Sequence, residues 1–228
     1  MNRQLLKSAD GTGSGGWSSD PAGIETPPFD RRKTAKVGLR VFLAVVTSLF
    51  FLFLIAFIAR SQVSDWQPLT APLAPLAHPW MLWLNTLLLA CGSISLQWAR
   101  VAARRNDTGS TLLGFAFAGV FAMAFLAGQL WVWQQFIAWG YPVSSNPANS
   151  FFYLLTGLHG LHLLGGLVAW GWTVIRLLRR TPLEKLGSGV ELCATYWHYL
   201  LALWIVLFAL LTSTPETYQA IAAFCGLR

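Results

Sequence analysis

The sequence predicts an all-α integral membrane protein, a bundle of five transmembrane helices. It contains five apolar blocks, each at least as long as the ~20 residues that an α-helix needs to cross a ~30 Å hydrocarbon core. The blocks lack the alternation of barrel strands, and backbone groups in lipid find no water, so helices are favoured over a barrel. Only 11% of the 228 residues are charged, against about 25% in soluble domains.

The five predicted helices lie between polar or proline-rich connections. They cover residues 37–59, 80–102, 111–136, 151–177 and 190–212. Residues 1–36 are rich in Gly, Ser, Asp and Pro, and they cannot bury enough apolar surface to order themselves. We therefore predict a flexible cytoplasmic tail over 1–36, a membrane domain over 37–213 and a short external tail over 214–228.

Basic residues alternate between the connections and orient the bundle, because cytoplasmic loops carry an excess of Lys and Arg. The connections 61–79 and 138–149 contain no basic residue, although Arg60 borders the first of them. The remaining connections and their flanks carry Arg31, Arg32, Lys33, Lys36, Arg100, Arg104, Arg105, Arg176, Arg179, Arg180 and Lys185. The N-terminus is therefore predicted to be cytoplasmic and, after five crossings, the C-terminus external.

Several function classes are excluded by what the chain lacks. The net charge is +7, but its short basic clusters form no continuous face for nucleic acid. Cys91, Cys193 and Cys225 are scattered, without the spacing of a zinc or iron–sulfur site. The chain also lacks a nucleophile elbow, a phosphate loop and a dinucleotide fingerprint. We expect no catalytic residue in it.

Polar side chains inside the last three predicted helices are the candidate functional residues. His159 and His162 are three residues apart and share a helix face, and Glu191, Thr195 and His198 form an i, i+4, i+7 stripe. Gln129 is the only amide deep in the third helix. A charged group in a bilayer costs roughly 2.5–3.5 kcal/mol on insertion scales, so such groups usually face the bundle interior and mark a site, a pathway or a network.

Four interpretations of these residues remain open. They can fix helix packing through hydrogen bonds, or Glu191 and His198 can line a groove for a lipid headgroup or a proton-conducting water chain. Haem ligation needs two histidines at matching depth, and His198 lies nearer the inner half than His159 and His162. A dicopper or zinc site needs more ligands than three dispersed histidines supply.

Two segments resemble a known family. Residues 151–166, FFYLLTGLHGLHLLGG, are similar to the corresponding helix of haem–copper oxidase subunit III. Residues 191–199, ELCATYWHY, followed by Trp204, resemble the last-helix signature of the same family. Residues 84–89 and 125–131 fit its middle helices more loosely, so the resemblance covers about 37–212. Five helices are similar to the short bacterial form of the family.

The resemblance implies an accessory, non-redox subunit of a respiratory terminal oxidase in a bacterial inner (plasma) membrane. Such a subunit packs against the catalytic subunit I and other oxidase subunits, supports proton uptake and protects subunit I from inactivation during turnover. Haem and copper are expected in the partner subunits and none in this chain, whereas bound phospholipid is expected. The implied lipid-contacting or buried polar residues are Gln129, His159, His162, Glu191, Thr195, Trp197 and His198.

Two departures and three rival functions accompany this interpretation. Family members commonly carry a carboxylate in the first helix and another three residues after the Trp-His pair, where this chain has Ser48 and Leu201. Roles that depend on those carboxylates are therefore in doubt. The rivals are a subunit of a quinol oxidase or nitric oxide reductase-associated complex, a b-type haem membrane anchor, and a small transporter. The absence of a midplane acidic residue argues against a transporter.

Overall fold

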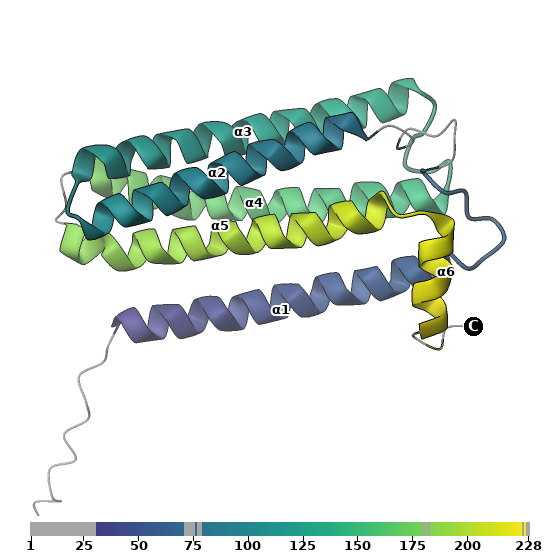
Figure 1. Cartoon of the computed structure of the whole chain (residues 1–228), viewed down its shortest axis with the longest axis horizontal. Helices are drawn as coiled ribbons and strands as arrows, with labels where there is room; N and C mark the ends of the chain where they lie inside the picture. Colours follow the sequence, from purple (N-terminus) through teal and green to yellow (C-terminus); the bar gives the residue numbers. More distant parts are fainter. Residues whose placement is uncertain are drawn as a thin grey trace, which may run out of the picture. The chain divides into compact units, whose positions relative to one another are not determined.

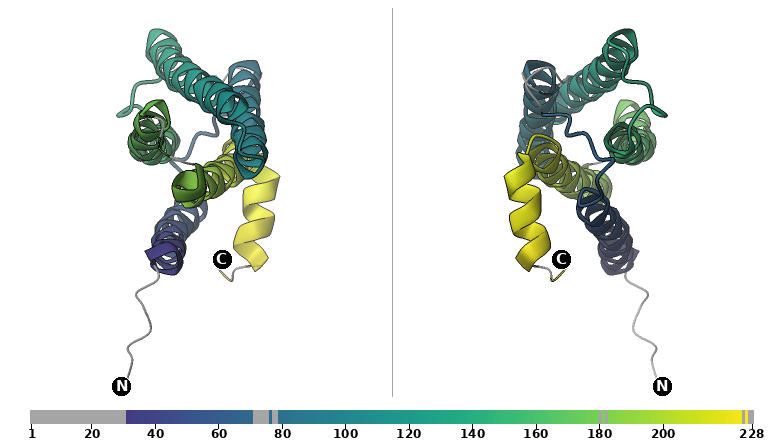
Figure 2. Two further views of the ribbon diagram at one scale, coloured as in Figure 1. Left: turned by 90° about the vertical axis from the view of Figure 1, so that its left-hand side faces the viewer. Right: turned by 90° about the vertical axis from the view of Figure 1, so that its right-hand side faces the viewer.

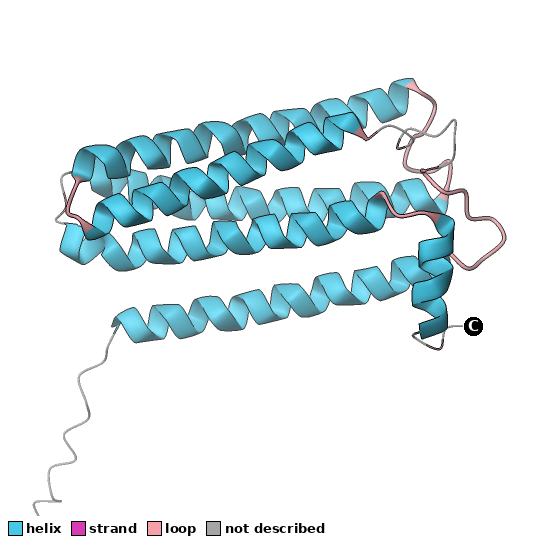
Figure 3. Cartoon of the chain, viewed as in Figure 1, coloured by secondary structure: helices cyan, strands magenta, loops and turns pink. Residues whose placement is uncertain are grey.

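Helices account for most of the residues that the structure, a computed structural model, describes, namely 31–70, 76, 79–179, 181, 183–224 and 226 (Figures 1 and 3). No strand occurs among these residues. The helices are α1 (Arg31–Arg60), α2 (Trp80–Arg104), α3 (Thr108–Ala138), α4 (Pro147–Leu178), α5 (Leu183–Leu211) and α6 (Pro215–Phe224). The first five are long and apolar enough to cross a membrane. The prediction of an all-helical membrane protein is thereby confirmed.

The helix ends extend beyond the apolar blocks. Helix α1 begins at Arg31, six residues before the apolar block, so residues 31–36 of the predicted tail are helical, and residues 1–30 lie outside the described part. Helix α4 begins at Pro147, where the fixed φ of proline suits the first helical position. Within the segment 214–228, which sequence analysis described only as a short tail, α6 spans Pro215–Phe224.

Local capping explains the sharp turns between helices. Asp107 precedes α3, and its carboxylate accepts a hydrogen bond from the Ser110 amide at 3.1 Å, which holds the pKa of Asp107 below its usual range. Asn146 precedes α4 and accepts from the Ala148 amide at 3.1 Å. Both side chains satisfy amide groups that a helix start leaves unpaired. The tight turn before Asp107 makes α2 and α3 antiparallel neighbours.

Helices α2 to α5 form a four-helix bundle (Figure 2). Glycines permit its closest approaches, because a Cβ atom on Gly114 of α3 would lie 2.7 Å from the Cβ of Ala99 and 2.8 Å from the Ser95 carbonyl oxygen on α2. A Cβ on Gly166 of α4 would lie 2.7 Å from the Tyr196 ring on α5. Small residues thus bring helix backbones close together, as is usual in membrane bundles.

Helix α1 is attached to this bundle by side chains that reach α4 and α5. Phe42 and Phe50 lie beside the His162 ring of α4, with centroids 6.4 and 5.5 Å away. At its other end, Phe57 packs edge-on against Tyr218 of α6 at 5.3 Å, and the Tyr218 hydroxyl donates to the Leu210 carbonyl at 2.9 Å. Helix α6 therefore runs across the end of α1, as Figure 1 shows.

Candidate functional site

A cluster of three charges joins α1, α2 and α5. One carboxylate oxygen of Glu191 lies 2.8 Å from the Lys36 ammonium of α1, and the other accepts a hydrogen bond from the Arg100 guanidinium of α2 at 3.2 Å. All three side chains are partly exposed, between 27% and 43%. One carboxylate thus neutralises two cations and ties α1 to the bundle. We call the end of the molecule around Lys36, Arg100 and Arg176 the basic end.

Glu191 is the only acidic residue inside the five candidate spans. Sequence analysis selected it but used Lys36 and Arg100 only to orient the chain. Each of these cations lies within about one helical turn of the end of its own span, and Glu191 lies five residues from the start of its span. Opposite charges at matching depth were the signal that would have predicted the cluster.

Buried polar side chains in the bundle core pair across helices. The Asn85 amide of α2 donates to the Gln129 carbonyl oxygen of α3 at 3.1 Å, and Gln129 is 4% exposed. The Trp204 indole of α5 donates to the Thr86 hydroxyl of α2 at 2.9 Å. These contacts fix α3 and α5 against α2, which is the packing role that sequence analysis considered for Gln129.

His159 lies in the centre of the core, fully buried. Its ring lies 5.1 Å from the Trp204 ring of α5 and 5.7 Å from the Phe125 ring of α3. Among the residues that the structure describes, neither imidazole nitrogen has a hydrogen-bond partner, and the buried Trp197 indole also lacks one. His159 therefore packs as an aromatic ring between α3 and α5.

His162 faces a different neighbour from His159, although they are three residues apart. Positions i and i+3 differ by about 60° around a helix of 3.6 residues per turn, and this is enough to turn His162 toward Phe50 of α1. The His162 Nδ1 donates to the Leu158 carbonyl at 2.7 Å. The Tyr196 hydroxyl of α5 donates to the His162 carbonyl at 2.8 Å. His162 thus belongs to the seam between α1, α4 and α5.

Thr195 and His198 lie on the outer surface of α5 and are exposed. The Thr195 hydroxyl donates to the Glu191 carbonyl at 2.9 Å, and the His198 Nδ1 donates to the Ala194 carbonyl at 2.5 Å. The sequence predicted polar groups facing the bundle interior, but His198 faces outward. The reason is that Trp197 and Trp204 fill the inward side of the same helix.

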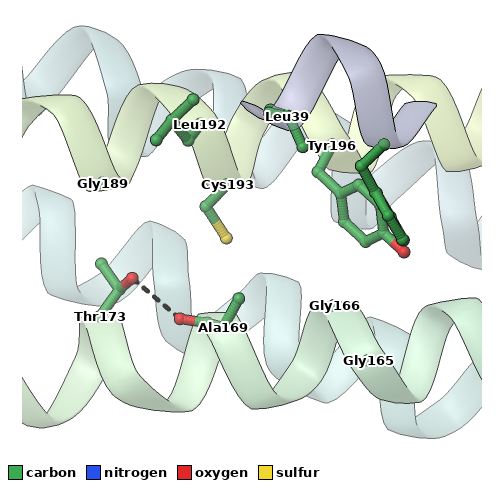
Figure 4. A pocket seen from close by; sticks show the side chains of 10 residues that line it. Leu39, Gly165, Gly166, Ala169, Thr173, Gly189, Leu192, Cys193 and Tyr196 are labelled. Atoms are coloured by element: carbon green, nitrogen blue, oxygen red, sulfur yellow. Dashed lines mark hydrogen bonds between the residues drawn. The ribbon is translucent and has the colours of Figure 1, made fainter. Parts of the chain in front are cut away.

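A cavity of about 370 Å³ separates α1 from α4 and α5 near the basic end (Figure 4). Its lining is mostly apolar, with Leu39 from α1, Ala169 from α4, and Leu192 and Cys193 from α5. The one hydroxyl that Figure 4 shows bonded, that of Thr173, donates to its own helix at Ala169 and so offers little to a polar ligand. The space suits a hydrocarbon chain.

Known proteins similar to this chain share one description. The family model for cytochrome c oxidase subunit III matches residues 24–213. A probable cytochrome c oxidase subunit 3 of Nocardia farcinica is 31% identical over 186 residues, which cover 79% of this chain and 88% of that protein. The corresponding protein of Mycobacterium leprae is 31% identical over 189 residues, covering 80% and 89%. That of Synechocystis is 31% identical over 179 residues, covering 76% and 72%.

The chain belongs to the cytochrome c oxidase subunit III family. Membership makes this subunit III part of an oxidoreductase complex with other oxidase subunits. The resemblance of the His159–His162 helix and of the Glu191–His198 helix is thereby confirmed. Within the described ranges, no group of three or more His, Cys, Asp or Glu side chains gathers as a metal site.

The two departures of this subunit III from the family pattern lie at its surface. The Ser48 hydroxyl is exposed and donates to the Ala44 carbonyl of its own helix at 3.0 Å. Leu201 lines a groove between α2 and α5, next to His198. Neither residue is part of the core network, so the polar contacts of Gln129 and Glu191 form without the missing carboxylates.

Proposed function

We propose that this chain is the accessory, non-redox subunit of a bacterial cytochrome c oxidase that holds and protects the catalytic subunit I. The proposal rests on the contacts that the polar side chains within the spans make. Glu191 is paired with Lys36 and Arg100, Gln129 is bonded to Asn85, and His159 is enclosed by aromatic rings. These contacts join helices to one another, which is the use of polar groups that an accessory subunit requires.

A scaffolding role fits the chemistry of the single carboxylate in the spans. Glu191 is paired with Lys36 of α1 and Arg100 of α2, so its carboxylate joins three helices. The support that this subunit gives to proton uptake is then indirect, by keeping subunit I and its surrounding lipid in place.

The membrane orientation follows from the basic end. Arg100, Arg104 and Arg176 lie at the end of the bundle where α1 begins, and cytoplasmic ends carry excess Lys and Arg. We place this end in the cytoplasm and the C-terminus outside, in the plasma membrane of a bacterium. In a chain whose native Cys225 is replaced by Ser, labelling of Ser213→Cys in intact cells, with no labelling of Gly109→Cys, is the expected result.

The cavity between α1, α4 and α5 is the proposed phospholipid site. Its apolar lining suits an acyl chain. The exposed cation Arg40 directly follows the lining residue Leu39, and the exposed Arg176 lies about one helical turn after the lining residue Thr173, so an anionic headgroup would sit beside them. Filling the cavity with Ala169→Phe should remove about one phospholipid from the purified complex in native mass spectrometry. The control Val168→Phe faces outward and should leave the count unchanged. Equal lipid counts in both variants would contradict the site.

The test of the function is a pull-down of the tagged chain in mild detergent, with a reduced-minus-oxidised spectrum and a census of subunits. We expect a large haem–copper subunit to co-purify, and no haem to follow this chain when it is stripped off. If haem remained with the isolated chain, the b-type anchor would replace this proposal. Activity with quinol alone would assign the complex to the quinol oxidases.

Loss of the subunit should affect the lifetime of the enzyme more than its initial rate. A purified oxidase stripped of this chain is expected to start near the normal rate and then inactivate faster during turnover. If the stripped oxidase completes the same number of turnovers before it inactivates, the proposed protective role is wrong. Adding the purified chain back is the matched control, and it should restore the lifetime.

A further inference from the structure

His198 presents an unused hydrogen-bond acceptor to the outside of the bundle. Its Nδ1 bonds to the Ala194 carbonyl, and because a carbonyl only accepts, Nδ1 carries a proton. In the neutral imidazole the other nitrogen, Nε2, then keeps a lone pair. The side chain is exposed, and its Nε2 has no hydrogen-bond partner among the residues that the structure describes. The free nitrogen therefore needs a donor from outside this chain.

The depth of His198 limits what that donor is. His198 lies seven residues from Glu191, or about 10 Å along α5, so it lies well inside the hydrocarbon layer. Lipid tails have no donor, and lipid-exposed polar groups find no water at this depth. Polar side chains in membrane helices usually bond across to a neighbouring helix. A second helix supplies what lipid cannot.

The surface around His198 is shaped to receive a helix. A groove of about 560 Å³ runs between α2 and α5, and His198 and Leu201 line its α5 side. Ser93 lies at its floor, and Ile94 and Trp98 form the opposite wall, 69% and 46% exposed. Figure 1 shows α5 running between α2 and α1.

A second polar group in the groove points to the same occupant. Gln97 of α2 is exposed in this groove, and its amide has no hydrogen-bond partner in the described part of the chain. The exposed surface of α4 is different in character, with Leu161, Val168 and Trp172 more than 60% exposed. An apolar surface of that kind is matched by lipid tails, whereas the groove offers both a free imidazole and a free amide.

We infer that the groove between α2 and α5 is the docking surface for a transmembrane helix of another oxidase subunit, which donates a hydrogen bond to His198 Nε2. The donor is a hydroxyl, amide or indole group. This inference rests on the proposed function, because it identifies the face by which the subunit joins the complex. The partner helix covers Gln97 and His198 together and excludes lipid from Ser93.

A site-specific photocrosslink in native membranes tests the docking face. Ile94, in the groove, is replaced by p-benzoylphenylalanine, and the matched control is the same replacement at Val168, which is 63% exposed on α4. We expect the Ile94 position to form an adduct that mass spectrometry identifies as an oxidase subunit, and the Val168 position to label lipid. Lipid adducts alone at Ile94, or a subunit adduct at Val168 in its place, would overturn the inference.

The role of His198 is tested in the same tagged complex. His198→Leu should reduce the amount of subunit that stays with the oxidase after a detergent wash roughly fivefold, the factor expected for one lost hydrogen bond. His198→Gln should retain it, because the Gln carbonyl oxygen can occupy the place of Nε2. Equal retention of the Leu and Gln variants would exclude the hydrogen bond.

The two proposals fail in different ways. If the chain never co-purifies with a haem–copper subunit, the proposed function is wrong. If it co-purifies but crosslinks through Val168, the function stands and only the docking face is wrong.

Discussion

Helix α1 and the four-helix bundle of α2 to α5 are held together by different means. In the most apolar part of its span, 22% of α1 is buried, whereas the corresponding figure for α5 is 56%. The bundle depends on close approach at Gly114, which faces the backbone of α2, and at Gly166, which faces the Tyr196 ring of α5. Helix α1 depends on a few side chains, chiefly Lys36, Thr47 and Phe57. The bundle is thus the rigid unit, and α1 is a tethered helix with space for lipid beneath it.

The largest effect is expected from the bundle itself. Gly114→Ala places a methyl group against the Ser95 carbonyl and Ala99 backbone of α2, which cannot move without displacing the helix. We expect a loss of roughly 1–3 kcal/mol in stability, as for overpacked cores. Gly171→Ala is the control, because its added Cβ meets no atom within 4 Å. Both variants gain the same helix propensity from replacing Gly by Ala. Thermal unfolding in detergent measures the difference, and equal midpoints would contradict the close approach.

Breaking the charge cluster should loosen α1 and spare the bundle. Glu191→Gln keeps the side-chain shape but leaves Lys36 and Arg100 without their counter-ion. We expect the variant to lose roughly 1–3 kcal/mol in stability, a value between those measured for exposed and for buried ion pairs. Proteolysis between α1 and α2 should become faster, while the haem spectra of the complex stay unchanged. Loss of haem signals from an assembled complex would show that Glu191 serves the redox centres.

A smaller effect is expected from the hydrogen bond that joins the middle of α1 to α5. The Thr47 and Tyr199 hydroxyls lie 2.9 Å apart, and one net hydrogen bond contributes about 0.5–1.5 kcal/mol. Thr47→Val and Tyr199→Phe should each destabilise the attachment, and the double variant should cost less than their sum. Ser48→Ala is the control, because its hydroxyl bonds only within α1. Strict additivity would mean that the two hydroxyls do not interact.

The smallest effect concerns an exposed ion pair at the far end of α1. Arg60 donates two hydrogen bonds to the Asp65 carboxylate, and these hold the pKa of Asp65 below its usual range. Because the folded pKa is lowered, the contribution is present above the ordinary carboxyl pKa of about 3.9 and is lost as the pH falls through the lowered value. In a pH series, the unfolding midpoint of Asp65→Asn should fall slightly less at acid pH than that of the unaltered chain. High salt should have the same effect on the unaltered chain.

The five long helices could be predicted because each corresponds to one continuous run of apolar residues in the sequence. Helix α6 could not, because an isolated helix of ten residues is marginal. Tyr218 of this helix packs against Phe57, which lies far away in the sequence, and donates to the nearby Leu210 carbonyl. The same holds for the pairing of Glu191 with Arg100, 91 residues away. His159 and His162 were selected as a pair, but only the packing of α1, α3 and α5 determines that they face different neighbours.

The contacts of α1 with the last two helices set an order for biosynthesis. Helix α1 ends at Arg60, and its partners α5 and α6 begin at Leu183 and Pro215. At 5–20 residues per second, the roughly 120 residues between α1 and α5 take on the order of ten seconds to translate. During that interval α1 can contact only α4, through Phe42 and Phe50 against His162, and Lys36 is not yet neutralised by Glu191. The newly made chain is therefore most exposed to quality-control proteases before its last forty or so residues are complete.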